Sequence, residues 1–119
     1  MKYQWLEEYA TAKTGAYKEF KVEWEAFRYM IRDKMFIMHA ADGKGKEIIT
    51  VKLEPEYGQL LRAQYEGDIV PGYYMNKDHW NSVYVEGNVP DDVLRGMIDK
   101  SYELILGGFS KKAQLEILA

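Results

Sequence analysis

The sequence predicts an α+β fold, in which one twisted antiparallel sheet carries helices packed on one of its faces. Two observations lead to this class. Between residues 17 and 53, apolar and polar residues alternate with the period of two that is typical of strands. On either side of that stretch, apolar residues recur at helical spacing. The 119 residues fit one domain, residues 1–119, with the expected element order α-β-β-β-(β)-α-β-β-α-α.

The first half is expected to form one helix followed by an antiparallel meander. The helix covers residues 3–12 and ends at Gly15, because a left-handed cap forms most easily without a side chain. The apolar residues Phe20, Val22 and Trp24 alternate with charged ones, which predicts a strand whose apolar side faces the core. Further strands are expected over residues 27–31, 35–39 and 49–53, joined by turns at 32–34 and 42–46.

The second half is expected to return to helices after two short strands. A helix begins at Pro55, since proline suits a first helical turn, and Tyr57, Leu60 and Leu61 form its apolar stripe. The two strands cover residues 69–74 and 82–86.

The longest helix is expected to begin at Pro90 and to stop at the pair Gly107-Gly108. Its spacing points five residues inward: Leu94, Met97, Ile98, Ser101 and Ile105. Ser110 then caps a last short helix that carries Ala113, Leu115 and Leu118.

Composition excludes several classes of protein. The absence of cysteine rules out disulfides, thiolate catalysis, and zinc or iron–sulfur sites built on cysteine. No apolar run approaches the roughly 20 residues that a membrane-spanning helix needs, and the first residues lack a signal-peptide core. We therefore expect no membrane partner and a cytoplasmic location.

One segment and its surroundings carry a family resemblance. The run Met75-Asn76-Lys77-Asp78-His79-Trp80-Asn81 is followed by Val89-Pro90-Asp91-Asp92 and then by Ile98-Asp99-Lys100-Ser101-Tyr102. In this order the motifs resemble the MmcQ/YjbR family of small bacterial α+β proteins. Lys34-Met35-Phe36 also resembles the family pattern, although Asp33 stands where glycine is common. The resemblance implies a fold like that of secretion chaperones and frataxin. It also implies DNA binding through two projecting hairpins, a "double wing", although the family is mostly uncharacterised.

The charge distribution gives the DNA hypothesis its candidate residues. The chain has a net charge of −3, yet residues 13–52 hold 9 basic and 6 acidic side chains. Basic side chains on the wet face and turns of the meander would bind phosphates weakly and with strong salt dependence. The candidates are Arg28, Arg32, Lys34, Lys44, Lys46 and Lys52. The alternative is that Glu19, Glu23 and Glu25 on the neighbouring strand pair with Arg28, Arg32 and Lys52 across the sheet.

The segment around residues 76–80 predicts a second kind of site. A cleft there would hold a small ligand or a segment of another protein, with six lining residues: Tyr73, Tyr74, Asn76, Lys77, His79 and Trp80. The alternative is purely structural. Asn76 would then cap a single turn by accepting from the N–H of Asp78 or His79, and Trp80 would close the edge of the core.

Catalysis and metal binding find little support. His39 and His79 lie on different elements, and neither has a ligand one helical turn away. Ser101 lies inside a helix, where its hydroxyl is expected to bond a carbonyl one turn back. A hydrolase centred on His79 stands as a third hypothesis behind the two binding functions. We therefore expect a non-enzymatic binding protein without a cofactor or metal, whose partner is DNA, a protein or a small ligand.

Overall fold

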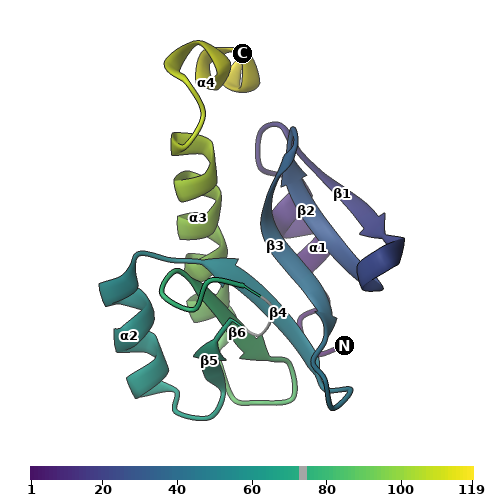
Figure 1. Ribbon diagram of the computed structural model, residues 1–119, viewed down its shortest axis with the longest axis vertical. Coiled ribbons are helices and arrows are strands. Elements are labelled where there is room, and N and C mark those ends of the chain that lie inside the picture. The colour runs from purple at the N-terminus through teal and green to yellow at the C-terminus, as the bar shows by residue number, and fades with distance from the viewer. Residues whose placement is uncertain (73–74) are drawn as a thin grey trace.

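The fold is α+β, with one open antiparallel sheet of six strands in the order β1-β2-β3-β4-β6-β5 (Figure 1). The computed structural model describes residues 1–72 and 75–119. In chain order the elements are α1 (Leu6–Thr11), β1 (Ala16–Lys21), the 3₁₀ turn η1 (Val22–Trp24), β2 (Ala26–Ile31), β3 (Lys34–Ala41), β4 (Glu47–Lys52), α2 (Pro55–Gln64), β5 (Ile69–Pro71), β6 (Trp80–Tyr84), α3 (Asp91–Gly107) and α4 (Lys111–Leu118). The predicted fold class and element order are confirmed. No helix in the described part of the chain is long and apolar enough to cross a membrane.

Helices α1 and α3 cover one face of the sheet. Helix α3 contacts β3 and β4, and α1 contacts β1; in Figure 1 the strands pass in front of α1 and of the lower part of α3. Tyr29, Ile37 and Val51 form one cross-strand row that belongs to the core beneath these helices. From α3, the five residues predicted to point inward are all buried. The long helix therefore supplies the main lid of the core.

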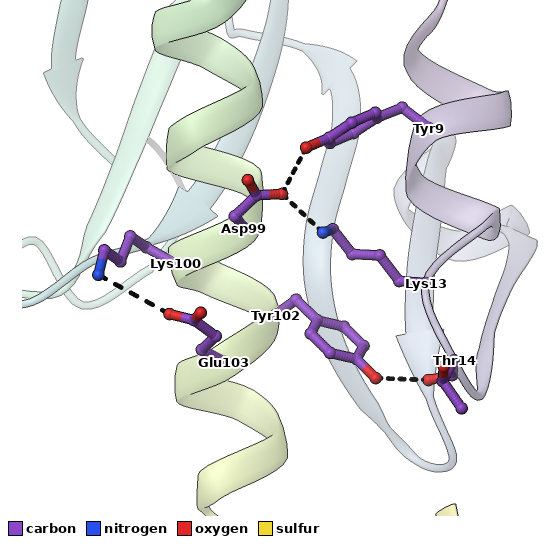
Figure 2. A network of polar contacts seen from close by, with 7 residues as sticks. All are labelled: Tyr9, Lys13, Thr14, Asp99, Lys100, Tyr102 and Glu103. Atoms are coloured by element: carbon purple, nitrogen blue, oxygen red, sulfur yellow. Dashed lines mark hydrogen bonds and ion pairs between the residues drawn. The ribbon is translucent and has the colours of Figure 1, made fainter. Parts of the chain in front are cut away.

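Polar contacts fasten α1 and the following loop to α3 (Figure 2). The Asp99 carboxylate accepts from the Tyr9 hydroxyl at 2.7 Å and from the Lys13 ammonium at 2.6 Å. The hydrogen bond to Asp99, with a contribution from burial, raises the pKa of Tyr9 above its usual value. One turn further along α3, the Tyr102 hydroxyl donates to the carbonyl of Thr14 at 2.6 Å. The Asp99 and Tyr102 side chains of the family motif thus hold two elements together.

Ser101, from the same motif, joins α3 to the sheet at an irregularity. Residue Phe36 is extra in the β2–β3 register, which passes from the pair Met30–Met35 to the pair Tyr29–Ile37. The Ser101 hydroxyl donates to the Phe36 carbonyl at 2.6 Å and accepts from the Lys52 backbone N–H at 2.9 Å. The prediction that this hydroxyl bonds a carbonyl one turn back was therefore wrong. The pairs of β3 and β4 end at Ile37–Val51, so Phe36 and Lys52 are the next residues of these two strands, and the Ser101 hydroxyl bonds a main-chain group of each.

The end of the first hairpin differs from the prediction. The strand ends at Lys21, and residues 22–24 form the turn η1 instead of continuing the alternation. Phe20, Val22 and Trp24 are 50%, 69% and 51% exposed, so their predicted place in the core was wrong. A six-residue helix such as α1 spans only roughly 9 Å, whereas a six-residue strand spans roughly 20 Å. The helix is too short to cover the whole of the first hairpin.

Smaller differences concern the other helices and the last two strands. Leu60, Leu115 and Leu118 are exposed, and α4 buries Ile117 instead, against Gly15. The last strand begins at Trp80 and ends at Tyr84, two residues earlier than predicted at each end. Strand β5 ends at Pro71, and part of the predicted strand falls on residues 73–74, outside the described residues. The predicted cap is confirmed, because the Ser110 hydroxyl accepts from the Ala113 N–H at 3.1 Å.

Candidate functional site

The face of the sheet opposite α1 and α3, here called the open face, carries a cavity. Successive side chains of a strand point to opposite faces, so the neighbours of the core row Tyr29–Ile37–Val51 point to this side. These neighbours are Arg28, Met38, Thr50 and Ser82, which form a cross-strand row of their own. Met38 is only 1% exposed. The open face is therefore partly apolar and partly sheltered.

A cavity of about 440 Å³ lies on this face, lined by Glu23, Trp24, Met38, Ala40 and Met75. Strand β3 supplies Met38 and Ala40, and the turn η1 supplies Glu23 and Trp24. Met75 comes from the segment that precedes β6. Its volume and mostly apolar lining are those of a small-molecule site.

The charges near the cavity are paired among themselves. The hydrogen bond from the Lys21 ammonium, 3.1 Å away, lowers the pKa of the Glu23 carboxyl, which is therefore ionised at neutral pH. Arg28 forms an ion pair with Glu19 on the adjacent strand, as one of the two sequence interpretations predicted. The guanidinium carbon of Arg28 lies 5.1 Å from the centre of the Trp24 ring, so this aromatic wall is held from one side by a cation.

The residues of the predicted cleft are fixed by local contacts. Asn76 caps a turn as predicted, because its side-chain oxygen accepts from the Asp78 N–H at 2.8 Å. The Lys77 ammonium donates to the Gly72 carbonyl at 3.1 Å, and Trp80 packs partly buried against the core. The His79 carbonyl accepts from the Leu53 N–H at 2.7 Å. Tyr73 and Tyr74 lie outside the described residues.

Of the described residues that line the cavity, only Met75 adjoins the segment of residues 76–80. Sequence reasoning missed Trp24, Glu23, Met38, Ala40 and Met75 as candidates. Alternation placed Trp24 on the apolar side of a strand, and no signal in the sequence marks the turn η1 as the wall of a cavity.

The basic candidates for DNA binding lie in separate places. Arg32 and Lys34 lie at the β2–β3 turn beside α4, where Arg32 is 3.3 Å from Glu116 and Lys34 is 4.8 Å from the ring centre of Phe109. Lys44 and Lys46 lie at the β3–β4 turn, at the other end of the eight-residue β3 and roughly 25 Å away at the usual strand rise. Arg28 and the half-buried Lys52 belong to the sheet between them.

The β3–β4 turn is organised by Asp42. Its Oδ1 accepts from the N–H groups of Lys44 and Lys46, each at 2.9 Å, and its Oδ2 accepts from the Tyr84 hydroxyl at 3.1 Å. The backbone hydrogen bond from Lys46 is the largest of several contacts that lower the pKa of Asp42 from 3.8. This turn therefore presents its two lysines on a fixed backbone.

We expect the Asp42 carboxylate to make stability depend on pH in acid. Because its folded pKa lies below its unfolded value of 3.8, its contribution is complete above that pH and is lost as the pH falls through the folded pKa. Asn at this position keeps one acceptor oxygen and does not ionise. Urea unfolding at pH 5 and pH 3 should thus show a smaller acid loss for Asp42→Asn than for the native chain. Equal acid losses in the two proteins would contradict the assignment.

Neither histidine belongs to a metal-binding cluster in the part of the chain that the structure describes. The His39 Nε2 lies 2.5 Å from the Glu47 carboxylate, on β4. Residues 1–72 and 75–119 contain no group of three His, Cys, Asp or Glu side chains arranged to hold a metal ion. The Ser101 hydroxyl is hydrogen-bonded to the main chain of Phe36 and of Lys52, in the interior between α3 and the sheet.

Comparison with known proteins identifies the family. A family model described as YjbR matches residues 11–104, from the end of α1 to the last turns of α3. The chain belongs to the YjbR family. The resemblance carried by the motifs is thus confirmed, and helix α4 lies outside the matched stretch.

The YjbR relatives cover most of the chain. It is 33% identical over 98 residues to the uncharacterized protein YjbR of Escherichia coli (strain K12), which covers 82% of this chain and 81% of the relative. It is 34% identical over 98 residues to the uncharacterized protein YbdF of Escherichia coli O157:H7, covering 82% of this chain and 77% of the relative.

Solved structures give the same result for the fold. The crystal structure of Deinococcus radiodurans protein DR2400, described as a DUF419 domain, matches with a TM-score of 0.82 and 26% identity, over 94% of this chain and 84% of that one. A Pseudomonas syringae protein matches at 0.70 and 24% identity, over 87% of this chain and 98% of that one. These names describe no ligand or activity, so a function must be argued from the residues.

Proposed function

We propose that this YjbR-family protein is a non-enzymatic binding protein that holds a small, flat, mainly apolar ligand in the cavity of the open face. The cavity between Trp24 and Met75 is the observation that carries the proposal. An aromatic ring offers a stacking surface, and the thioethers of Met38 and Met75 adapt their shape to a ligand and contact its ring favourably. Among the described residues, this cavity shares no lining residue with the cleft predicted around residues 76–80, and it adjoins that segment only through Met75.

The ionised Glu23 gives the ligand a preferred chemistry. A carboxylate at the wall of an apolar cavity accepts hydrogen bonds and favours positive charge. The ligand should therefore carry an ammonium group or N–H donors at one edge of its ring, and an acidic ligand should be disfavoured. Because Lys21 already neutralises part of this charge, the preference is a matter of degree.

Two probes with the same ring test the proposal. Tryptamine and indole-3-acetate share an indole ring and differ in the sign of their charge. In a titration followed by backbone amide NMR, tryptamine should shift the signals of Met38 and Ala40 and bind about tenfold more tightly than indole-3-acetate. Trp24→Ala should weaken tryptamine at least tenfold while leaving the fold intact, because Trp24 is half exposed.

Matched variants keep this test specific. Leu60→Ala removes another exposed apolar side chain, on α2, and should leave tryptamine binding unchanged. Glu23→Gln should reduce the difference in affinity between tryptamine and indole-3-acetate. Shifts that gather on another surface, or equal responses of Trp24→Ala and Leu60→Ala, would refute the cavity as the binding site.

Weak DNA binding through the β3–β4 turn is the second candidate function, and the placement of Lys44 and Lys46 favours it. Both side chains are exposed at the turn, and no carboxylate of the described residues lies within ion-pair distance of either ammonium. Arg28 and Arg32 are committed to Glu19 and Glu116, which leaves few free cations for phosphates. A titration against duplex DNA at two salt concentrations decides: phosphate contacts require affinity to fall steeply as salt rises.

A further inference from the structure

The two edges of the sheet are protected to different degrees. Strand β5 is three residues long and ends at Pro71, two features that discourage the addition of another strand. Strand β1 at the other edge has six residues and no proline, and in the described part of the chain it pairs only with β2. Its outer main-chain N–H and C=O groups therefore form an open template for a further strand.

Exposed aromatic residues flank this template on both faces of the sheet. Tyr17, 44% exposed, lies in register with Met30 of the open face, whereas Phe20, 50% exposed, lies opposite Phe27 on the helix-covered side. The rings of Phe20 and Phe27 meet edge to face at 5.0 Å, and Phe27 is itself 40% exposed. Apolar side chains gathered along a free edge are the usual companions of strand addition, where they contact alternate side chains of the incoming segment.

The charges of β1 argue against a second copy of this chain as the partner. In a two-fold symmetric antiparallel sheet, facing residues lie on the same side, so a strand that pairs with itself must centre on one of its own residues. The registers that use most of β1 place Lys18 opposite Lys18 or Glu19 opposite Glu19. Like charges directly opposite each other are destabilising. The edge is thus discouraged from pairing with itself while remaining open to another sequence.

We propose that the outer edge of β1 binds an extended segment of a different protein as a seventh, antiparallel strand. Charge complementarity defines the chemistry of that segment. It would carry acidic residues opposite Lys18 and Lys21, a basic residue opposite Glu19, and apolar residues opposite Tyr17 and Phe20. Lys18 is already 2.5 Å from Glu7, and Glu19 is paired with Arg28, so the incoming charges extend existing pairs. Lys21, the last residue of β1, is paired with Glu23 of the cavity wall, so this edge adjoins the cavity, but the addition of a strand does not require the proposed ligand.

A short peptide with blocked ends tests the proposal. The sequence Glu-Val-Lys-Glu-Val-Thr, aligned antiparallel from Lys21 to Ala16, satisfies each requirement, and Lys-Val-Glu-Lys-Val-Thr reverses its charges without changing its apolar positions. The first peptide should bind the whole protein about tenfold more tightly than the second. It should also slow amide hydrogen exchange at alternate residues of β1. Phe20→Ser should weaken binding at least fivefold, while Leu60→Ser, at a similarly exposed site on α2, should not.

Three outcomes would overturn the proposal. The first is equal affinity for the two peptides, because the charges of β1 would then select nothing. The second is protection that appears at β5 instead of β1. The third is protection of β1 that rises with protein concentration in the absence of peptide, since this would make a second copy of the chain the natural occupant of the edge.

Discussion

Replacing Ser101 by alanine should lower the free energy of unfolding by about 2–4 kcal/mol. The hydroxyl serves two main-chain groups at once, the carbonyl of Phe36 and the N–H of Lys52. Ser101 itself is fully buried. A buried polar group left without a partner costs about 1–3 kcal/mol, and alanine would leave two. Urea unfolding, with the midpoint and the slope both recorded, measures the loss.

Ser110→Ala is the matched control for this prediction. It removes the same hydroxyl from an exposed N-cap that serves one N–H group at the start of α4. Loss of such a cap costs about 1 kcal/mol, because water replaces the hydroxyl. If Ser101→Ala lost no more stability than Ser110→Ala, the bridge between α3 and the bulged sheet would have no special energetic role.

Ser101 also illustrates what sequence reasoning reached and where it stopped. Helical spacing placed its side chain on the buried face of α3, which is confirmed. Its partners could not be predicted, because Phe36 is 65 residues away and Lys52 is 49 residues away, at the end of the β3–β4 pairing. Local bonds such as the caps of Asn76 and Ser110 were predicted correctly, since the donor and acceptor lie within three residues of each other.

The candidate site was harder to predict than the fold for a related reason. Alternation shows that a strand has two faces, yet it does not show how far a helix covers either of them. Trp24 was therefore assigned to the core, although the chain turns at η1 and places this ring at the cavity of the opposite face. Cross-strand pairing was predicted for Arg28 and is found with Glu19. Arg32 instead pairs with Glu116 of α4, and the alternation of the strands does not predict where that helix lies.

Asn81→Leu is expected to cost about 2–4 kcal/mol and to disturb the wall of the cavity. Asn81 is fully buried, and its side-chain oxygen accepts from the Arg62 guanidinium of α2 while its amide nitrogen donates to the His79 carbonyl at 3.2 Å. Leucine has nearly the same volume but offers neither group. The change would leave Arg62, which is half buried, without this acceptor, and removing one partner of a buried charged contact is strongly destabilising.

A double-mutant cycle separates this loss from simple misfit. Arg62→Met removes the cation, so Asn81→Leu should cost clearly less in that background, by about 1 kcal/mol or more. Space is tight on this side of α2, since a Cβ on Gly58 would lie 3.0 Å from the Asn81 oxygen. Because the His79 carbonyl ends the segment that begins at Met75, Asn81→Leu should also shift the Met75 amide signal in the NMR spectrum. Asn81→Leu could instead lower the free energy of unfolding equally in the native and the Arg62→Met backgrounds. Leucine would then be disfavoured for its shape alone, and the contact between Arg62 and Asn81 would not hold the segment that carries Met75.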